Sequence, residues 1–333
     1  MQFSIFKCMF MFTLVTGTLL SISSTSWFGA WIGLELNLLS FIPIMITMND
    51  QYSSEAALKY FLIQALGSSL VMTTVALMML YNEQIYILLF SALALKLGAA
   101  PFHFWFPEVM SELSWPKAII LMTIQKVAPL FLLCYLASEE LISKYFYAFA
   151  LISAAMGALG GLNQTSLRKI MAFSSINHMG WLLISALISE SMMIMYFLFY
   201  CLISFSVVIT FQYGQMFHFK HLMTAKTSTS IKILAFMSLL SLGGLPPFTG
   251  FFPKWMVIQE IASVKGGVCL ITLLGASLIT LYFYLRVATV FLTLSKNKLM
   301  ILFDEGSYRS TLICFLIFTN FVGLLVPSFM MTF

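Results

Sequence analysis

The chain consists of long apolar runs separated by short polar segments. Most runs continue for about 20 residues, the length that an α-helix needs to cross the hydrocarbon core of a bilayer. A membrane β-barrel is disfavoured, because its strands alternate apolar and polar residues, whereas these runs are continuous. The pattern predicts an all-α, polytopic membrane protein with about eleven transmembrane helices, at residues 3–23, 26–48, 55–80, 85–105, 114–136, 145–163, 168–188, 191–213, 231–264, 267–294 and 309–331.

Two of the predicted helices contain related segments. The segments PFHFWFPEVM at 101–110 and PFTGFFPKWM at 247–256 are identical at five of ten positions, with an offset of 146 residues. Each belongs to the fourth helix of a five-helix block, so we predict repeats at 1–136 and 145–294, followed by a final helix at 309–331. Because five is odd, the second repeat would be inverted, and interrupted helices in inverted repeats typically mark the working site of a transporter. The alternative is that proline merely kinks two helices near their ends.

Composition narrows the class of protein. Of the 333 residues, 61% are hydrophobic and 9% are charged, and the mean hydropathy is +0.98. Soluble domains are about 25% charged, so these values exclude a soluble enzyme, a secreted disulfide scaffold and a disordered chain. We expect one membrane domain over residues 1–333, in contact with lipids. The net charge of +5 does not indicate nucleic-acid binding, because the sequence has no dense basic cluster.

The basic residues are distributed unevenly between the two sides of the predicted bundle. With eleven helices, ten of the seventeen lysines and arginines lie on the side of the N-terminus, two lie on the other side and five lie within helices. Loops on the cytoplasmic side of membrane proteins carry an excess of such residues. We therefore expect the N-terminus on the cytoplasm-equivalent side and the C-terminus on the opposite side.

Charged residues inside the predicted helices are the main candidates for function. A charge at the bilayer centre costs about 2.5–3.5 kcal/mol on insertion scales, and the charges that persist there usually carry ions, protons or ligands. Four such residues are Glu35, Lys96, Lys126 and Lys254. We interpret Glu35 as the titrating partner of a lysine, and a structural ion pair between two helices is the alternative. A lysine balanced between burial and a nearby carboxylate can release its proton when that partner moves.

Helix breakers lie close to each of the three lysines. Lys96 precedes Pro101, Lys126 precedes Pro129, and Lys254 follows the glycine- and proline-rich segment 243–250. Proline removes a backbone hydrogen bond, so we expect Pro129 to open a gap that admits water beside Lys126. The pattern predicts a proton relay formed by Glu35, Lys96, Lys126 and Lys254.

Further titratable residues are weaker candidates. Histidine side chains in general titrate near neutrality, so His178 is a candidate link between the lysines through water, and a hydrogen-bonded packing role is the equal alternative. Lys59 lies about one turn inside its helix, and snorkelling to the interface is an equal alternative. Arg286 holds its proton too firmly to relay it. His103 lies at the first break, and His218 and His221 are expected to be solvated.

Other chemistries have no support in the sequence. There is no dinucleotide-binding glycine motif or P-loop, no paired histidines for haem, and no zinc or iron–sulfur spacing among the five cysteines. We therefore expect no cofactor and no metal in this chain.

Several sequence blocks resemble one family closely. They are Trp31–Pro43, Lys96–Glu108, Gln125–Pro129, Arg168–Gly180 and Gly244–Trp255. In these blocks the chain is similar to the antiporter-like, proton-pumping membrane subunits of respiratory complex I, in an insect-like mitochondrial form. In that family the charged helix positions correspond to Glu35, Lys96, Lys126 and Lys254, with His178 on a later helix. Related subunits often have glutamate where this chain has Lys254.

The resemblance implies a function and a location. The chain would translocate protons in the mitochondrial inner membrane, with its N-terminus in the matrix and its C-terminus in the intermembrane space. Its partners would be other membrane subunits of complex I, and FMN, iron–sulfur clusters and ubiquinone would lie in other subunits. A standalone cation/proton antiporter and an inert structural subunit are the alternatives.

Overall fold

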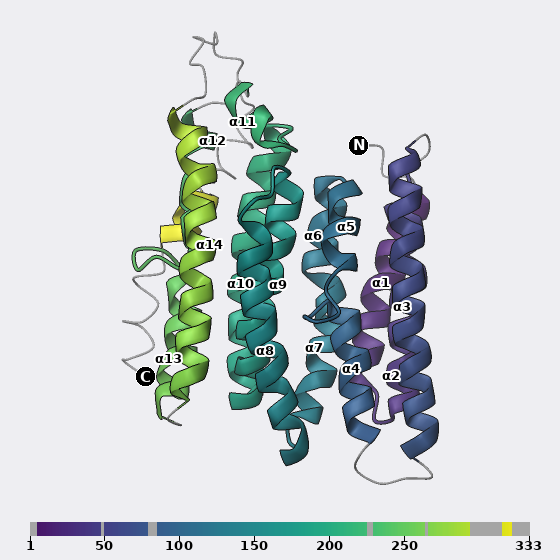
Figure 1. Ribbon diagram of the computed structural model, residues 1–333. Helices are drawn as coiled ribbons and strands as arrows, with labels where there is room; N and C mark the ends of the chain where they lie inside the picture. The colour runs from purple at the N-terminus through teal and green to yellow at the C-terminus, as the bar shows by residue number, and fades with distance from the viewer. Residues whose placement is uncertain are drawn as a thin grey trace. The chain divides into compact units, whose positions relative to one another are not determined.

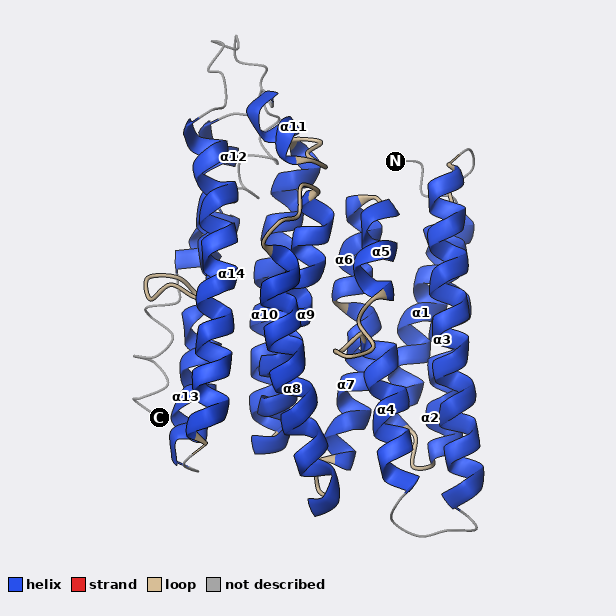
Figure 2. Ribbon diagram, in the orientation of Figure 1, coloured by secondary structure: helices blue, strands red, loops and turns tan. Residues whose placement is uncertain are grey.

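The computed structural model describes residues 5–47, 50–78, 85–224, 229–263, 266–293 and 315–321 (Figures 1 and 2). Its named elements are all α-helices, which confirms the all-α prediction for the described part of the chain. They are α1 (Ile5–Ser23), α2 (Trp27–Met45), α3 (Gln51–Met78), α4 (Ile85–Leu97), α5 (Trp105–Glu112), α6 (Trp115–Met122), α7 (Ile124–Leu136), α8 (Glu140–Gly161), α9 (Leu167–Ile188), α10 (Glu190–Tyr213), α11 (Phe219–Thr224), α12 (Thr229–Gly243), α13 (Phe251–Ser263) and α14 (Gly267–Thr293). Residues 315–321 are also helical.

The described helices follow the predicted spans. Eight segments are long and apolar enough to cross a membrane, namely α1, α2, α3, α8, α9, α10, α14 and the continuous stretch Trp115–Leu136 of α6 and α7. Two shorter apolar helices, Ile85–Leu97 and Ile231–Gly243, belong to the predicted spans that are interrupted. The predicted span 309–331 lies outside the described residues except for 315–321, so the number eleven stays a prediction.

The chain divides into two compact units. The first comprises residues 1–153 and 186–190, and the second comprises residues 154–185 and 191–333. In the first unit α2 packs against α1 and α3, and α3 packs against α4 and α5. In the second unit α14 packs against α12 and α13. The division falls inside α8, so it follows neither end of the predicted repeats, and the inverted repeat stays a prediction.

The two predicted helix interruptions are present at matching positions. Helix α4 ends at Leu97 and α12 ends at Gly243, while α5 begins at Trp105 and α13 at Phe251, so the offset of 146 residues holds at both boundaries. Gly98 and Gly244 follow the first helices with φ of +69° and +79°, a conformation that favours glycine. In each case the next amide donates to a carbonyl five residues earlier, Ala99 to Ala94 (3.0 Å) and Leu245 to Leu240 (3.4 Å). This is a Schellman helix ending, and the same local backbone geometry therefore occurs twice.

A third interruption lies where the sequence did not predict one. Helices α6 and α7 meet at Thr123, which has φ −114° and ψ −80°, and the hydroxyl of Thr123 donates to the carbonyl of Ile119 at 2.7 Å. Pro129, which was expected to open the gap, lies inside α7. A proline inside a helix removes one backbone donor without forcing the helix to end, so the water-admitting gap at Pro129 stays a prediction.

Candidate functional site

Lys96 is buried in the first unit, in the last turn of α4. It is 6% exposed, and the Gln64 amide on α3 donates to its backbone carbonyl at 3.1 Å. A methyl group at Gly67 would lie 3.0 Å from Lys96 Cγ, so this glycine leaves room for the lysine stem. A cation in this turn is favoured by the negative end of the helix dipole.

Glu35 faces this lysine from α2 without direct contact. The two charges interact electrostatically, but no ion pair within 4.0 Å joins them in the described part of the chain. Glu35 Oε2 is buried and has no hydrogen-bond partner there. Glu35 and Lys96 are therefore close enough to interact through space but do not form a direct ion pair.

Lys126 lies in the first turn of α7, directly after the interruption at Thr123. It is 2% exposed, and its Nζ lies 4.9 Å from the centre of the Phe106 ring on α5. Lys96 and Lys126 line the same small cavity. The structure thus brings Glu35, Lys96 and Lys126 into one neighbourhood within the first unit.

Lys254 lies in the second unit, in the first turn of α13, and is 5% exposed. Its Nζ donates to the carbonyls of Leu242 (3.3 Å) and Gly243 (2.9 Å) at the end of α12. The last carbonyls of a helix lack intrahelical donors and carry its negative dipole end, so they stabilise this ammonium group. A methyl group at Gly244 would lie 2.8 Å from Lys254 Cδ, which is a second reason for glycine there.

His178 is buried on α9 in the same unit. It is 5% exposed, its Nδ1 lies 3.0 Å from the Tyr196 hydroxyl, and its ring is 5.1 Å from that of Tyr200. Trp181 stacks on Tyr196 and also lies under Lys254 Nζ, 6.0 Å from the ring centre. An aromatic cluster therefore joins His178 and Lys254 within the second unit.

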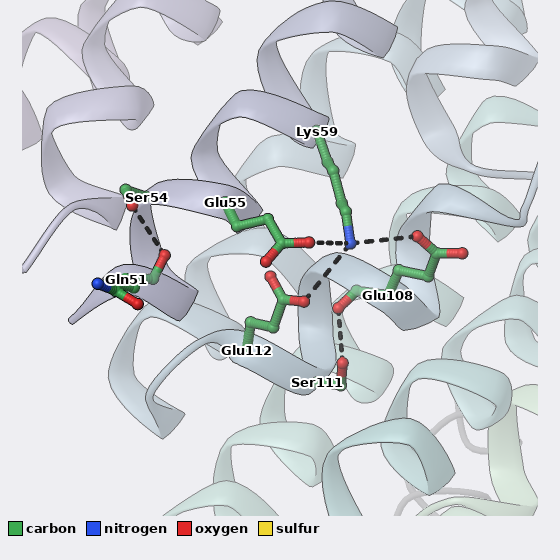
Figure 3. A network of polar contacts seen from close by, with 7 residues as sticks. All are labelled: Gln51, Ser54, Glu55, Lys59, Glu108, Ser111 and Glu112. Atoms are coloured by element: carbon green, nitrogen blue, oxygen red, sulfur yellow. Dashed lines mark hydrogen bonds and ion pairs between the residues drawn. The ribbon is translucent and has the colours of Figure 1, made fainter.

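Lys59 belongs to a carboxylate cluster at the polar ends of α3 and α5 (Figure 3). Its Nζ lies 2.9 Å from Glu55 and 3.6 Å from both Glu108 and Glu112. The side chain of Lys59 is 36% exposed, whereas that of Glu112 is 16% exposed. The sequence alone left the role of Lys59 open, and the structure shows an ion-paired residue.

Replacing Glu112 with glutamine is expected to raise the heat stability of the assembled protein at pH 7 by at most about 1 kcal/mol. Burial raises the pKa of Glu112, against the opposing effect of Lys59, so its charged form is the less favourable one in the fold. The gain should vanish as the pH falls below the ordinary carboxyl range, because Glu112 is then protonated. Lys59→Met should lower the heat stability instead. The measurement is the fraction of assembled protein that survives heating, and a gain for Lys59→Met would contradict the ion-paired role of Lys59.

The structure also places the remaining candidates. Arg286 is exposed on α14, with its guanidinium 5.4 Å from the Phe219 ring. His103 is 3% exposed at the first interruption, with Nδ1 3.3 Å from the Pro101 carbonyl. His218 and His221 have rings 5.5 Å apart, and the described residues contain no group of three metal-ligating side chains.

Sequence reasoning missed three polar residues of the first unit. Tyr60, Gln64 and Gln125 line the cavity beside Lys96 and Lys126. Tyr60, Gln64 and Gly67 are spaced i, i+4 and i+7, which places them on one face of a helix. Two features of the sequence could have indicated these residues. They are polar side chains at that spacing in an apolar span, and a glutamine beside a buried lysine.

Comparison with known proteins identifies one family. Residues 24–86 and 82–280 match the family described as "NADH:quinone oxidoreductase/Mrp antiporter, TM". The chain is 46% identical to NADH-ubiquinone oxidoreductase chain 2 of Anopheles gambiae over 96% of each chain. It is 45% identical to the protein of the same name from Aedes aegypti over 95% of each chain.

Solved structures share the fold. A chain of "Respiratory complex I from Thermus thermophilus with bound Aureothin" superposes with a TM-score of 0.85 and 22% identity, over 97% of this chain and 79% of that chain. A chain of the archaeal membrane-bound sulfane sulfur reductase also gives 0.85, with 17% identity, over 96% and 72%. From the family match and the close relatives, the chain belongs to the NADH:quinone oxidoreductase/Mrp antiporter family of membrane proteins, among relatives named NADH-ubiquinone oxidoreductase chain 2.

Proposed function

We propose that this chain is a membrane subunit of an NADH:ubiquinone oxidoreductase and that it translocates protons through buried lysines. The names of its close relatives support membership of that enzyme, and they favour it over a standalone antiporter. The observation that carries the proposal is the placement of Lys96 and Lys126 on one cavity, with the Glu35 carboxylate near enough to act on Lys96. Charges buried in this way within a bundle typically serve ion or proton pathways.

The proposed mechanism is proton relay without a covalent step. A change elsewhere in the enzyme weakens the attraction between Glu35 and Lys96, and the Lys96 ammonium then releases its proton more readily. The proton passes to Lys126, and restoring the Glu35–Lys96 attraction draws a new proton to Lys96. Lys254, with His178 as a possible link, serves the same transfer in the second unit. FMN, iron–sulfur clusters and ubiquinone belong to other subunits in this proposal.

The proposal includes a location and partners. We infer a multi-pass protein of the mitochondrial inner membrane, with the N-terminus in the matrix and the C-terminus in the intermembrane space. The uneven distribution of basic residues supports this orientation. Other membrane subunits of the enzyme and lipids would cover the apolar side chains exposed on helices such as α3 and α14, among them Leu62, Leu66, Ile271 and Leu278.

The Glu35→Gln variant tests the first step of the relay in the assembled enzyme. Glutamine keeps the shape of the side chain and removes its charge, so Lys96 loses the field that modulates it. We expect fewer protons moved per NADH oxidised in liposomes, with normal amounts of assembled enzyme. Glu139→Gln, in the short segment between α7 and α8, is the control for removal of a carboxylate. An unchanged proton yield for Glu35→Gln would remove Glu35 from the relay, and cation exchange by the isolated chain without NADH would favour a standalone antiporter.

A further inference from the structure

A small cavity of the first unit joins residues from four stretches of helix. It lies between α3, the end of α4, the start of α5 and the junction of α6 with α7. Its polar lining comes from Tyr60, Gln64, Lys96, Gln125 and Lys126, and apolar side chains such as Trp105 and Phe106 close it. It has room for about one water molecule, and a polar wall with several partners is what such a water requires.

Tyr60 has a fixed position at this cavity. The residue is 2% exposed, and its ring lies 5.3 Å from that of Phe41 and 5.9 Å from that of Trp105. Its hydroxyl donates to Gln125 Oε1 at 3.0 Å. Because the ring is held by aromatic neighbours, this hydrogen bond fixes the orientation of the Gln125 amide.

The other end of that amide supplies a donor. Gln125 Nε2 is buried and makes no hydrogen bond within the described part of the chain. A buried N–H group without an acceptor is unfavourable, so a polar partner is expected beside it. Gln125 lines the cavity together with Lys96 and Lys126, and a water molecule there would accept from the amide.

A water held in this way can connect the two lysines by hydrogen bonds. Ammonium groups are donors only, so two charged lysines cannot hydrogen-bond to each other. A water can accept from the Lys96 ammonium while it donates to a neutral Lys126 amine, and the amide of Gln125 fills its other acceptor position. The proton then moves along two hydrogen bonds, from Lys96 to the water and from the water to Lys126.

We propose that Tyr60 and Gln125 are positioning residues that hold a water molecule between Lys96 and Lys126. Tyr60 orients the amide, and the amide orients the water. The inference rests on the proposed function, since it assigns roles within the Lys96–Lys126 transfer. Gln64 is not part of the pair, because its amide nitrogen is already bound to the Lys96 carbonyl.

Three variants of the intact enzyme in liposomes test the pair: Tyr60→Phe, Gln125→Met and the double variant. Each single variant should slow NADH-driven proton transfer two- to ten-fold, the size expected for loss of one neutral hydrogen bond. The solvent deuterium isotope effect on turnover should rise, because proton transfer becomes more rate-limiting. The double variant should be no slower than the slower single variant, since both changes release the same water. A purely structural role would not change the isotope effect.

Controls separate this inference from the proposed function. Tyr135→Phe removes a hydroxyl from an exposed residue of α7 in the same unit and should behave as the unaltered enzyme does. If Lys96→Met stops proton transfer while Tyr60→Phe and Gln125→Met leave both rate and isotope effect unchanged, the relay stands and the positioning pair is wrong. If Lys96→Met is itself without effect, the proposed function fails. Multiplicative effects in the double variant would also overturn a shared water.

Discussion

Replacing Lys96 with methionine is expected to lower coupled NADH oxidation and proton transfer by roughly 100-fold or more, the usual effect of removing a group that moves a proton in a reaction step. Methionine has a similar length, so the contact with α3 that Gly67 permits is retained. The relay loses its first ammonium group, and Glu35 loses the cation that it faces. The measurement is the initial rate of NADH-driven acidification in liposomes containing the purified enzyme.

The matched control for this variant is Lys144→Met. Lys144 is an exposed lysine on α8 in the same unit, so its replacement removes the same charge without touching the cavity. We expect normal turnover and normal proton yield from the control. An assembled Lys96→Met enzyme with the proton yield of the parent enzyme would exclude Lys96 from the relay and favour a structural role for the buried charges.

Much of the fold could be predicted because the bilayer limits what the sequence can do. A run of about 20 apolar residues has to be helical to satisfy its own backbone in lipid, and ten of the predicted spans correspond to described helices. The interruptions after Leu97 and Gly243 were also predictable, because both lie in glycine- and proline-rich segments with the same offset. Structural elements that follow hydropathy and helix-breaking rules can therefore be predicted from the sequence.

The interruption at Thr123 was not predictable on those grounds. The segment 119–126 contains no glycine or proline, yet α6 ends at Thr123, whose hydroxyl donates to the Ile119 carbonyl. The cavity was missed for a related reason: Tyr60 and Gln125 are 65 positions apart, and no local pattern links α3 with α7. The charged candidates were visible one at a time because a charge is conspicuous in an apolar run, whereas their neutral polar neighbours are not.

Gly250→Ala is expected to be the most damaging small substitution in the second unit. A methyl group at Gly250 would overlap the carbonyl oxygen of Ser241, so α12 and the segment before α13 must separate. That carbonyl is held in place, because the Ser241 hydroxyl donates to Asn320 Oδ1 at 2.9 Å and the Thr249 amide donates to the Asn320 carbonyl at 3.2 Å. Overpacking of this kind costs about 3 kcal/mol, and we expect little assembled protein and rapid loss on heating.

The control for this substitution lies in the same unit. A methyl group at Gly275, inside α14, would have nothing within 4 Å, and alanine is favoured over glycine in a helix by about 0.5–1 kcal/mol. Gly275→Ala should therefore assemble as well as the parent enzyme. The two variants add the same atom to the same unit, so a difference between them isolates the close approach at Ser241. If Gly250→Ala instead survives heating as the control does, the α12–α13 junction is not tightly packed. The carbonyls of Leu242 and Gly243 would then not be held rigidly enough to fix the Lys254 ammonium in place.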